Sequence, residues 1–349
     1  MTAVDALSAP IRIATLNLFN FIAPPLAYYE QFNIYSEPQW QQKCHWISRY
    51  LAEHQPDIIG FQEVFSVVEL QQLLLQAGYP YFAVIDNPEL IDAYIYQQPV
   101  TALASRYPIV NSDALKVAPQ ARAQLWLSAD FSFSRKPLWA QVNIPGLGLC
   151  DCYVVHFKSK RSQFNECENG NINADFGDAA ASIQRLAEAS LVRSALRSRY
   201  RECGLPMILM GDFNDALTSD LLQGLVSPNR VTKANAPHAQ TQAQSTAQTS
   251  SQPQAQSQGA ALQLFDSFHL FEQETGQTLA AIPTHYYGGH GQVLDYILLS
   301  QDFAPSYCWQ LACVEGYEVF DCHLLRPDYA LDSHSTDHGV VMVTVQLRQ

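Results

Sequence analysis

Residues 207–215 read MILMGDFND, an apolar run that gives way abruptly to acidic and amide side chains. Four large apolar residues in succession are typical of a strand that is buried on both faces. Gly211 ends the run, and Asp212 and Asn214 follow closely. The stretch therefore predicts a buried strand with polar side chains at its carboxyl end, which is where α/β folds collect their functional groups.

Other apolar segments carry polar residues in the same way. They are Asn17 after IRIATL, Glu63 after DIIGFQ, His156 after CDCYVV, Asp295 within VLDYILL, and Asp337 and His338 just before VVMVTV. Taken singly, each of these residues is typical of a cap or a turn. Because they recur at the ends of separate segments, we expect their side chains to meet in one site.

The order of the expected elements predicts an α/β (α+β) fold. We expect strands at 11–17, 57–62, 81–85, 101–105, 123–133, 139–144, 148–156, 207–210, 293–299 and 340–347, and helices at 40–54, 67–77 and 179–200. This mixture predicts two β-sheets packed face to face with helices on the outside. No internal repeat is apparent, which excludes repeat architectures, and the length fits one large domain or two ordinary ones.

Composition excludes several classes of protein. Hydrophobic residues make up 48% of the 349 residues and charged residues only 15%, which excludes a disordered acidic chain. The net charge of −13 argues against a protein that coats duplex DNA. Residues 156–201 are the exception, with eight Lys and Arg against five Asp and Glu. A small basic strip on an acidic chain suits a site that holds one or a few phosphates.

Three further features bear on organisation and location. Residues 235–259 are a Gln/Ala/Ser-rich tract that predicts a disordered insertion within the domain. The eight cysteines form no CxxC pair, which indicates free thiols in a reducing compartment. No apolar stretch reaches the ~18–20 residues of a membrane span, and the first ten residues do not resemble a secretion signal. We therefore expect a cytoplasmic protein without a membrane partner, and no protein partner is evident.

The polar residues at the strand ends form a chemically coherent set. Carboxylate and amide oxygens dominate it, and these are the ligands that suit a hard cation such as Mg²⁺ or Mn²⁺. His156 and His338 add groups that can contact a phosphate or transfer a proton. The sequence contains no phosphate-binding GxxxxGK[ST] loop, no GxGxxG turn and no GxSxG elbow, so nucleotide-driven motors, dinucleotide enzymes and serine hydrolases lack their usual signals.

Six motifs in order resemble the endonuclease/exonuclease/phosphatase superfamily. They are TLN at 15–17, FQEV at 61–64, VVHFKSK at 154–160, GDFND at 211–215, LDYIL at 294–298 and STDHG at 335–339. The likeness covers nearly the whole chain and implies a single domain over residues 1–349, a four-layer sandwich with divalent-metal-dependent phosphodiesterase activity. The segment after His156 is similar to that of bacterial nucleases with an HFKSK signature.

The resemblance also implies roles for individual residues. Glu63 would be the principal metal ligand, with Asn17 beside it and Asp337 on or near the metal. Asp212 and Asn214 would position and deprotonate the attacking water. The remaining assignments are His338 on the scissile phosphate, Asp295 as its orienting partner, His156 on another phosphate oxygen or the leaving group, and Lys158, Lys160, Arg161 and Arg185 on neighbouring phosphates. The sequence leaves open whether Asp212 or His338 is the general base, and whether the four basic residues are structural instead.

These features predict a metal-dependent phosphodiesterase that acts by in-line attack of water, with a nucleic acid, DNA or RNA, as the expected substrate. The alternative within the same fold is a small phosphoester, such as an inositol phosphate, a nucleotide or a phospholipid head group. A third hypothesis is a binding module that kept the fold without catalysis. That hypothesis predicts that at least one catalytic position is missing, and every motif position is present.

Overall fold

The computed structural model of the chain describes residues 9–128, 130–162, 172–226 and 261–348, with the side chains of 172–175 excepted. The insertion predicted at 235–259 and the loop that contains Cys167 lie outside the described residues.

Two six-stranded sheets form the centre of the molecule. The first has the order β16 (Ala312–Phe320), β17 (Val340–Leu347), β1 (Ile11–Phe21), β3 (Ile58–Val64), β7 (Val100–Ser105) and β4 (Tyr81–Val84). The second has the order β12 (Leu264–Asp266), β15 (Asp295–Ser300), β11 (Met207–Asp212), β10 (Gly148–His156), β9 (Leu138–Ile144) and β8 (Ile109–Ala114). Each sheet contains one parallel pair, β1 with β3 and β10 with β11, and antiparallel strands flank both pairs.

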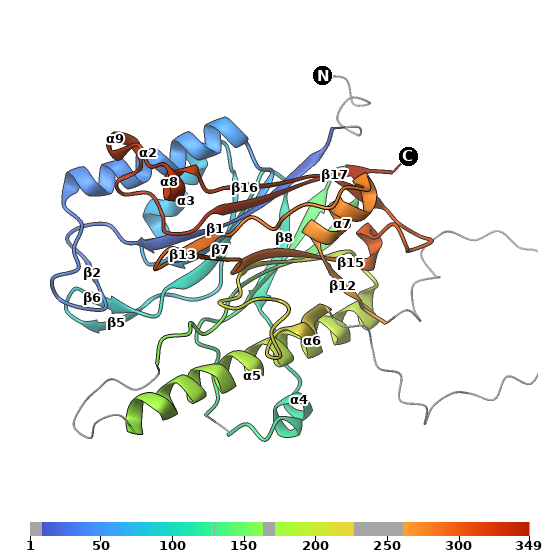
Figure 1. Cartoon of the computed structure of the whole chain (residues 1–349), viewed down its shortest axis with the longest axis horizontal. Coiled ribbons are helices and arrows are strands. Elements are labelled where there is room, and N and C mark those ends of the chain that lie inside the picture. The colour runs from blue at the N-terminus through green and yellow to red at the C-terminus, as the bar shows by residue number, and fades with distance from the viewer. Residues whose placement is uncertain (1–8, 129, 163–171, 227–260, 349) are drawn as a thin grey trace, which may run out of the picture.

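Helices cover the outer faces of the sheets (Figure 1). Side chains of α2 (Glu37–His54) and α3 (Val67–Gln76) pack on the first sheet, and those of α5 (Ile172–Cys203) and α6 (Gln223–Val226) on the second. The smaller elements are β2 (Ala27–Tyr28), β5 (Glu89–Asp92), β6 (Ile95–Gln97), α4 (Pro119–Gln124), α7 (Ser267–Thr275), β13 (His285–Tyr287), β14 (His290–Gln292), the 3₁₀ turn Gln301–Phe303, α8 (Cys322–Leu325) and α9 (Tyr329–Asp332). This arrangement confirms the predicted α/β sandwich.

Strand alternation divides the apolar side chains among three layers of core. In β17, Val341 and Val343 point between the two sheets, whereas Val340 and Met342 point toward α2 and α3. The same division occurs in the other central strands, because successive side chains of a strand point to opposite faces. Strands that are buried on both faces therefore appear in the sequence as continuous apolar runs.

Helix α2 shows how local sequence sets the ends of an element. Ser36 forms a capping box with Gln39, and a proline occupies the first turn, where its missing N–H costs nothing. The helix ends at Gln55, which adopts a left-handed conformation with φ of 49°. The apolar face predicted from the spacing packs against the first sheet through Trp46, Ile47 and Leu51.

The strand expected at 123–133 is wrong. Residues Pro119–Gln124 form the short helix α4, and turns follow it. Proline in the first turn favours the helix, and Trp126, with φ of 51°, is 94% exposed rather than packed in a sheet. The sequence pattern also missed β8, β12, β16 and α7, whose apolar residues alternate with many polar ones. No helix among the described residues is long and apolar enough to cross a membrane.

Gly211 allows the close contact between β10 and β11. Its φ is +143°, and a Cβ at this position would lie 1.9 Å from the Val155 carbonyl oxygen. Gly60 provides a matched control, because its Cβ would meet mainly the flexible end of Met210, at 2.8 Å from Sδ.

We expect Gly211→Ala to lower the free energy of unfolding by at least about 3 kcal/mol, because a backbone clash cannot relax without breaking the strand pairing. Gly60→Ala should cost about 1–3 kcal/mol, the usual cost of overpacking. Denaturant unfolding of both variants measures the difference. A Gly211→Ala protein at least as stable as Gly60→Ala would contradict this interpretation of the strand pair.

Candidate active site

The site forms where the inward-facing positions of the two sheets change from apolar to polar. Asp212 follows Met210 by two residues, and His156 follows Val154 by two, so each continues the row of side chains that faces the core between the sheets. The residue pairing of β10 with β11 places His156 directly beside Asp212. This set of polar side chains therefore caps one end of the apolar core.

Matching strands of the two sheets supply these side chains. The parallel strands contribute Asn17 and Asp212 from β1 and β11, and Glu63 and His156 from β3 and β10. The antiparallel neighbours contribute Asp295 at the start of β15 and His338 just before β17. An antiparallel strand begins at the edge where its neighbour ends, which explains why the sequence places these last two residues before or at the start of apolar runs.

Asp212 is the centre of the site. Its side chain is 1% exposed. Its Oδ2 accepts hydrogen bonds from the side-chain amides of Asn17 and Asn214, both at 3.2 Å, and its Oδ1 accepts one from the Asn214 backbone at 2.8 Å. Two imidazole nitrogens approach Oδ2, Nε2 of His156 at 3.5 Å and Nε2 of His338 at 3.9 Å. The bond from Asn17 to Asp212 links the two sheets.

Glu63 is held by the carboxyl-terminal part of β1. Its Oε1 accepts from the Asn17 amide at 3.3 Å, and its Oε2 accepts from the Asn20 backbone at 2.9 Å. Phe19, Asn20, Glu63 and Asn214 all have positive φ values, between 50° and 61°. Left-handed backbone is costly in residues other than glycine, and such strain concentrates at functional sites where the surroundings impose it.

His338 is oriented by Asp295. Nδ1 of His338 lies 2.8 Å from Oδ2 of Asp295, and the Thr284 hydroxyl donates to the same oxygen at 2.6 Å. The Thr284 hydroxyl in turn accepts from the backbone N–H groups of Leu294 and Asp295, which fixes its orientation. This chain of bonds leaves Nε2 of His338 to face Asp212 and the space in front of it.

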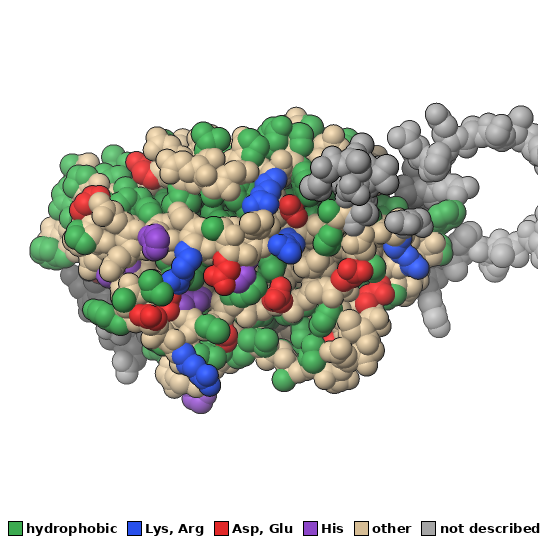
Figure 2. Space-filling view, turned by 90° about the horizontal axis from the view of Figure 1, so that it is seen from above, with side chains coloured by type: hydrophobic (Ala, Val, Ile, Leu, Met, Phe, Trp, Pro, Cys, Tyr) green, Lys and Arg blue, Asp and Glu red, His purple; other side chains and the backbone are tan. Residues whose placement is uncertain are grey.

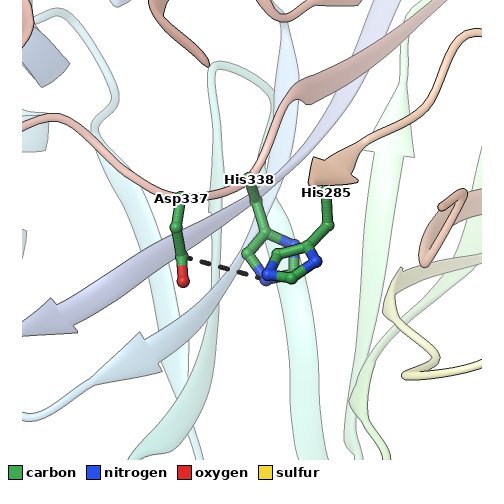
Figure 3. A group of neighbouring side chains, drawn as sticks. All are labelled: His285, Asp337 and His338. Carbon is green, nitrogen blue, oxygen red and sulfur yellow. Dashed lines mark ion pairs between the residues drawn. The ribbon is translucent and has the colours of Figure 1, made fainter. Parts of the chain in front are cut away.

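Two groups of side chains at the site could hold a metal ion, and Figure 3 shows one of them. His285, Asp337 and His338 each offer one ligand atom within 4.8 Å of the others, as do Asp212, Asp295 and His338. Among the described residues, Asp337 Oδ1 and His285 Nδ1 are buried without a hydrogen-bond partner. The charges of Glu63 and Asp337 both act on Lys43. A set rich in carboxylates with an unpartnered oxygen fits a hard divalent cation.

Lys43 lies behind these carboxylates. Its ammonium is buried and donates to the Ser335 carbonyl at 2.8 Å. Burial lowers the pKa of Lys43 to about 8, and the charges of Asp337 and Glu63 oppose the decrease. The residue therefore anchors the segment that carries Asp337 and His338 to α2.

The basic strip after His156 is used largely within the protein. Lys158 donates from Nζ to the Arg161 carbonyl at 2.9 Å, and Lys160 pairs with Asp215 at 3.3 Å. Arg185 is only 3% exposed, donates to the Lys158 carbonyl at 2.9 Å and lies 3.4 Å from Asp215. Arg185 thus supports the loop from beneath, while the Arg161 side chain is exposed.

Burial and neighbouring charges separate the pKa values of the central groups. Burial and the charge of Asp295 raise the pKa of Asp212 to about 7. Burial lowers the pKa of His156 well below its ordinary value, and Arg135 adds to this effect. Burial also opposes the charge on His338, but Asp295 and Asp212 outweigh it and raise the pKa of His338 well above its ordinary value. His338 is thereby favoured as a cation and His156 as a neutral imidazole.

Sequence reasoning missed several residues that complete the site. They are Asn20, Lys43, Arg135, Thr284 and His285. None of them follows an apolar run, so strand-end patterning gave no signal for them. Thr284 precedes the β13–β14 hairpin and His285 begins it, and long-range contacts with Asp295, His338 and Gly339 bring both residues to the site.

A four-layer sandwich with acidic, amide and imidazole groups at one end of its core defines a class of metal-dependent phosphoester hydrolases. The sequence profile of the Endonuclease/Exonuclease/phosphatase family matches residues 31–338, and the chain belongs to this family. Members of the family hydrolyse phosphoester bonds with the help of a divalent metal ion.

Solved structures agree on the fold. The human Nocturnin catalytic domain with a bound sulfate anion is 17% identical over 97% of this chain and 95% of that chain, with a TM-score of 0.56. A family protein from Bacteroides vulgatus is 16% identical over 97% and 100%, with a TM-score of 0.55. Truncated Caenorhabditis elegans TDP2 is 14% identical over 97% and 97%, with a TM-score of 0.56. Comparison with curated protein sequences found no match.

The ion pair between His338 and Asp295 generates a prediction in the metal-free protein. The pKa of His338 should lie above the ~6.5 of an unperturbed imidazole. Because the folded-state value is the higher one, the pair stabilises the fold below pH ~6.5, and this contribution disappears as the pH rises through the folded-state value. NMR titration of the imidazole in EDTA measures it.

Asp295→Asn should lower the pKa of His338, whereas the titration of the distant His54, whose pKa burial lowers, should not move. A His338 that titrates at or below ~6.5 in the wild-type protein would show that Asp295 does not hold the imidazolium.

Proposed function

We propose that this protein is a phosphodiesterase that hydrolyses its substrate by in-line attack of water, and that the substrate is a nucleic acid. The observation that carries the proposal is the junction at Asp212, where an acid, two amides and two imidazoles converge at the end of the sandwich. Phosphoryl transfer requires mainly positioning and charge stabilisation, and this group of side chains supplies both.

Glu63, Asn17 and Asp337 would hold a divalent cation, for which we propose Mg²⁺ or Mn²⁺. Such a cation, when bound, polarises the phosphate and stabilises the leaving oxygen. The amide of Asn17 bonds both Glu63 and Asp212, so it fixes the metal-binding carboxylate relative to the carboxylate that acts on water.

Asp212 is our candidate for the general base. A base is most effective when its pKa lies near the working pH, and burial together with Asp295 raises the pKa of Asp212 to about 7. Asn214 holds the carboxylate through its backbone and side-chain N–H groups and is itself anchored by a bond to the Phe157 carbonyl at 3.0 Å. His338 is the weaker candidate, because Asp295 favours its protonated form.

We propose that the imidazoles of His338 and His156 contact the phosphate. Protonated His338 keeps Nδ1 on Asp295 and presents the Nε2 proton toward the reacting group. Neutral His156 approaches Asp212 from the neighbouring strand and offers one N–H donor. Charge-assisted donors of this kind stabilise the negative charge that spreads over the phosphate oxygens in the transition state.

Two guanidinium groups support a substrate with phosphates on either side of the cleaved bond. The charge of Arg135 acts on His156 and Lys158, and the exposed Arg161 acts on Lys158 and His285. We propose that both hold a phosphate next to the scissile one. DNA and RNA share this backbone chemistry.

The second candidate function is hydrolysis of a small phosphoester. The internal use of Lys158, Lys160 and Arg185 favours it, because these side chains then contribute less to a phosphate track. On the face shown in Figure 2, Lys and Arg side chains are few and separated from one another.

We propose that the protein is cytoplasmic. The cysteines that the structure describes form no disulfide, which agrees with this location.

Chelation should abolish activity. We expect EDTA to remove hydrolysis of plasmid DNA and of a small model diester, and Mg²⁺ or Mn²⁺ to restore both. Glu63→Gln keeps the side-chain shape but removes a charged ligand, so the metal concentration that gives half-maximal rate should rise by at least about tenfold. Circular dichroism checks that the variant folds. Full activity in EDTA would refute the metal assignment.

Different substitutions should affect the rate of hydrolysis and the binding of the polynucleotide. His338→Ala and Asp212→Asn should each lower kcat by about 10²–10⁴-fold, the usual contribution of a positioned acid or base. Neutralising Arg135 and Arg161 should weaken polynucleotide binding and reduce its salt slope by roughly one for each phosphate that the variant no longer neutralises. Turnover of a small diester at saturation should be unchanged in that double variant. If polynucleotide binding and its salt slope also stay at wild-type values, the small-phosphoester function takes precedence.

A further inference from the structure

A pocket lies on the outer face of the second sheet. It has a volume of about 750 Å³. Its walls are the end of β8 with the segment that follows (114–118), the carboxyl-terminal half of α5, and Trp139 and Tyr153 of the sheet. Tyr153 belongs to the apolar layer beneath α5, whereas His156 and Asp212 belong to the inner face. The sheet therefore separates this pocket from the candidate active site.

The pocket is strongly basic in a chain whose net charge is −13. Its charged lining residues are Lys116, Arg193, Arg197, Arg199 and Arg201, with Glu202 as the single acid. The basic residues between 156 and 201 therefore lie in two places. Those up to Arg185 lie near the candidate active site, and those from Arg193 onward line this pocket. The catalytic assignments use none of these five basic residues.

Three of the arginines are stacked along one helix. Arg193, Arg197 and Arg201 are spaced four residues apart, a spacing that brings side chains together on the surface of a helix. Like charges at this spacing repel each other and destabilise an isolated helix. Burial lowers the pKa of Arg193 to about 10, and the charge of Arg197 adds to the decrease. Burial and the charge of Arg201 likewise lower the pKa of Arg197.

The protein neutralises only part of this charge internally. Arg199 pairs with Asp151 at 2.8 Å and stacks on Trp139, and Lys116 pairs with Asp113 at 2.8 Å. Arg197 and Arg201, by contrast, form no ion pair with any residue that the structure describes. An anion from outside the protein would supply the missing counter-charge.

The rest of the lining adds hydrogen-bond donors. Ser190, Ser194 and Ser198 run beside the arginine stripe at the same spacing of four. The indole N–H of Trp139 has no acceptor among the described residues. Hydroxyl, indole and guanidinium donors around one concavity are the chemistry that recognises phosphate oxygens.

We propose that this pocket binds a linear polyphosphate group, either free or as part of a nucleotide. The stripe from Arg193 to Arg201 covers ~12 Å of helix, so its charges suit several linked phosphates better than one. The volume matches that of pockets that enclose a whole small ligand, which favours such a ligand over an extended polymer. This site does not depend on the proposed function.

Isothermal titration calorimetry on the full chain in EDTA tests the proposal with three probes: inorganic tripolyphosphate, ATP and adenosine. We expect tripolyphosphate and ATP to bind with similar affinity and adenosine not to bind, because the phosphates carry the recognition. The double substitution Arg197→Glu and Arg201→Glu should weaken binding of both phosphates at least tenfold. Arg326→Glu, at an exposed arginine elsewhere, is the matched control and should leave binding unchanged.

A second pair of variants assigns the binding to this pocket rather than to the active site. Neutralising Arg135 and Arg161 should leave tripolyphosphate binding intact, and circular dichroism checks the fold of every variant. If the glutamate variant does not fold, the single substitution Arg197→Gln replaces it. It should give a smaller but measurable decrease in affinity for tripolyphosphate. Binding that survives Arg197→Gln and the glutamate variant, binding that disappears on neutralising Arg135 and Arg161, or binding of single-stranded DNA with none of tripolyphosphate, would overturn the proposal.

Discussion

The hydrogen bond from Asn17 to Asp212 is the interaction on which the site depends, because it joins the two sheets where their shared core ends. An unpaired carboxylate in this position would be costly to bury, and the side chains around Asp212 meet that cost with donors from both sheets. The packing of the sandwich therefore sets the distances among the polar groups of the candidate active site. Gly60 and Gly211 also hold the strands close together. Gly60 leaves room for the side chain of Met210 in the other sheet, and Gly211 leaves room for the backbone of Val155 in the neighbouring strand.

Stability and function oppose each other at this end of the molecule. Burial raises the pKa of Asp212 and lowers those of His156 and Lys43, so the fold keeps charged or polar groups where apolar ones would be more stable. Left-handed backbone at Asn20 and Glu63 adds strain at the same place. The apolar layers between and outside the sheets offset these costs. The polar side chains are confined to one end of the core, so they leave most of these layers intact.

Positive charge is concentrated in two places rather than along a track. Arg135 and Arg161 act on the groups at the candidate active site, and the arginines of α5 line a pocket on the other side of the second sheet. The net charge of the chain is −13, but each of the two basic groups attracts phosphate locally. The contrast explains why the total charge of the chain is a poor guide to the chemistry of its sites.

The sequence by itself determined the layers of the sandwich and the positions of the residues that end its central strands. Both follow from local patterns: a strand buried on two faces is a continuous apolar run, and Asp212 or His156 is visible because it interrupts one. Local patterns predicted a strand at residues 123–133, and this was wrong. Pro119 begins a short helix there, and the exposed Trp126 lies in the turn that follows it. Only the tertiary structure brought Thr284 and Lys43 to the site and turned Arg185 inward, because these contacts join segments that lie far apart in the chain and no local pattern records them.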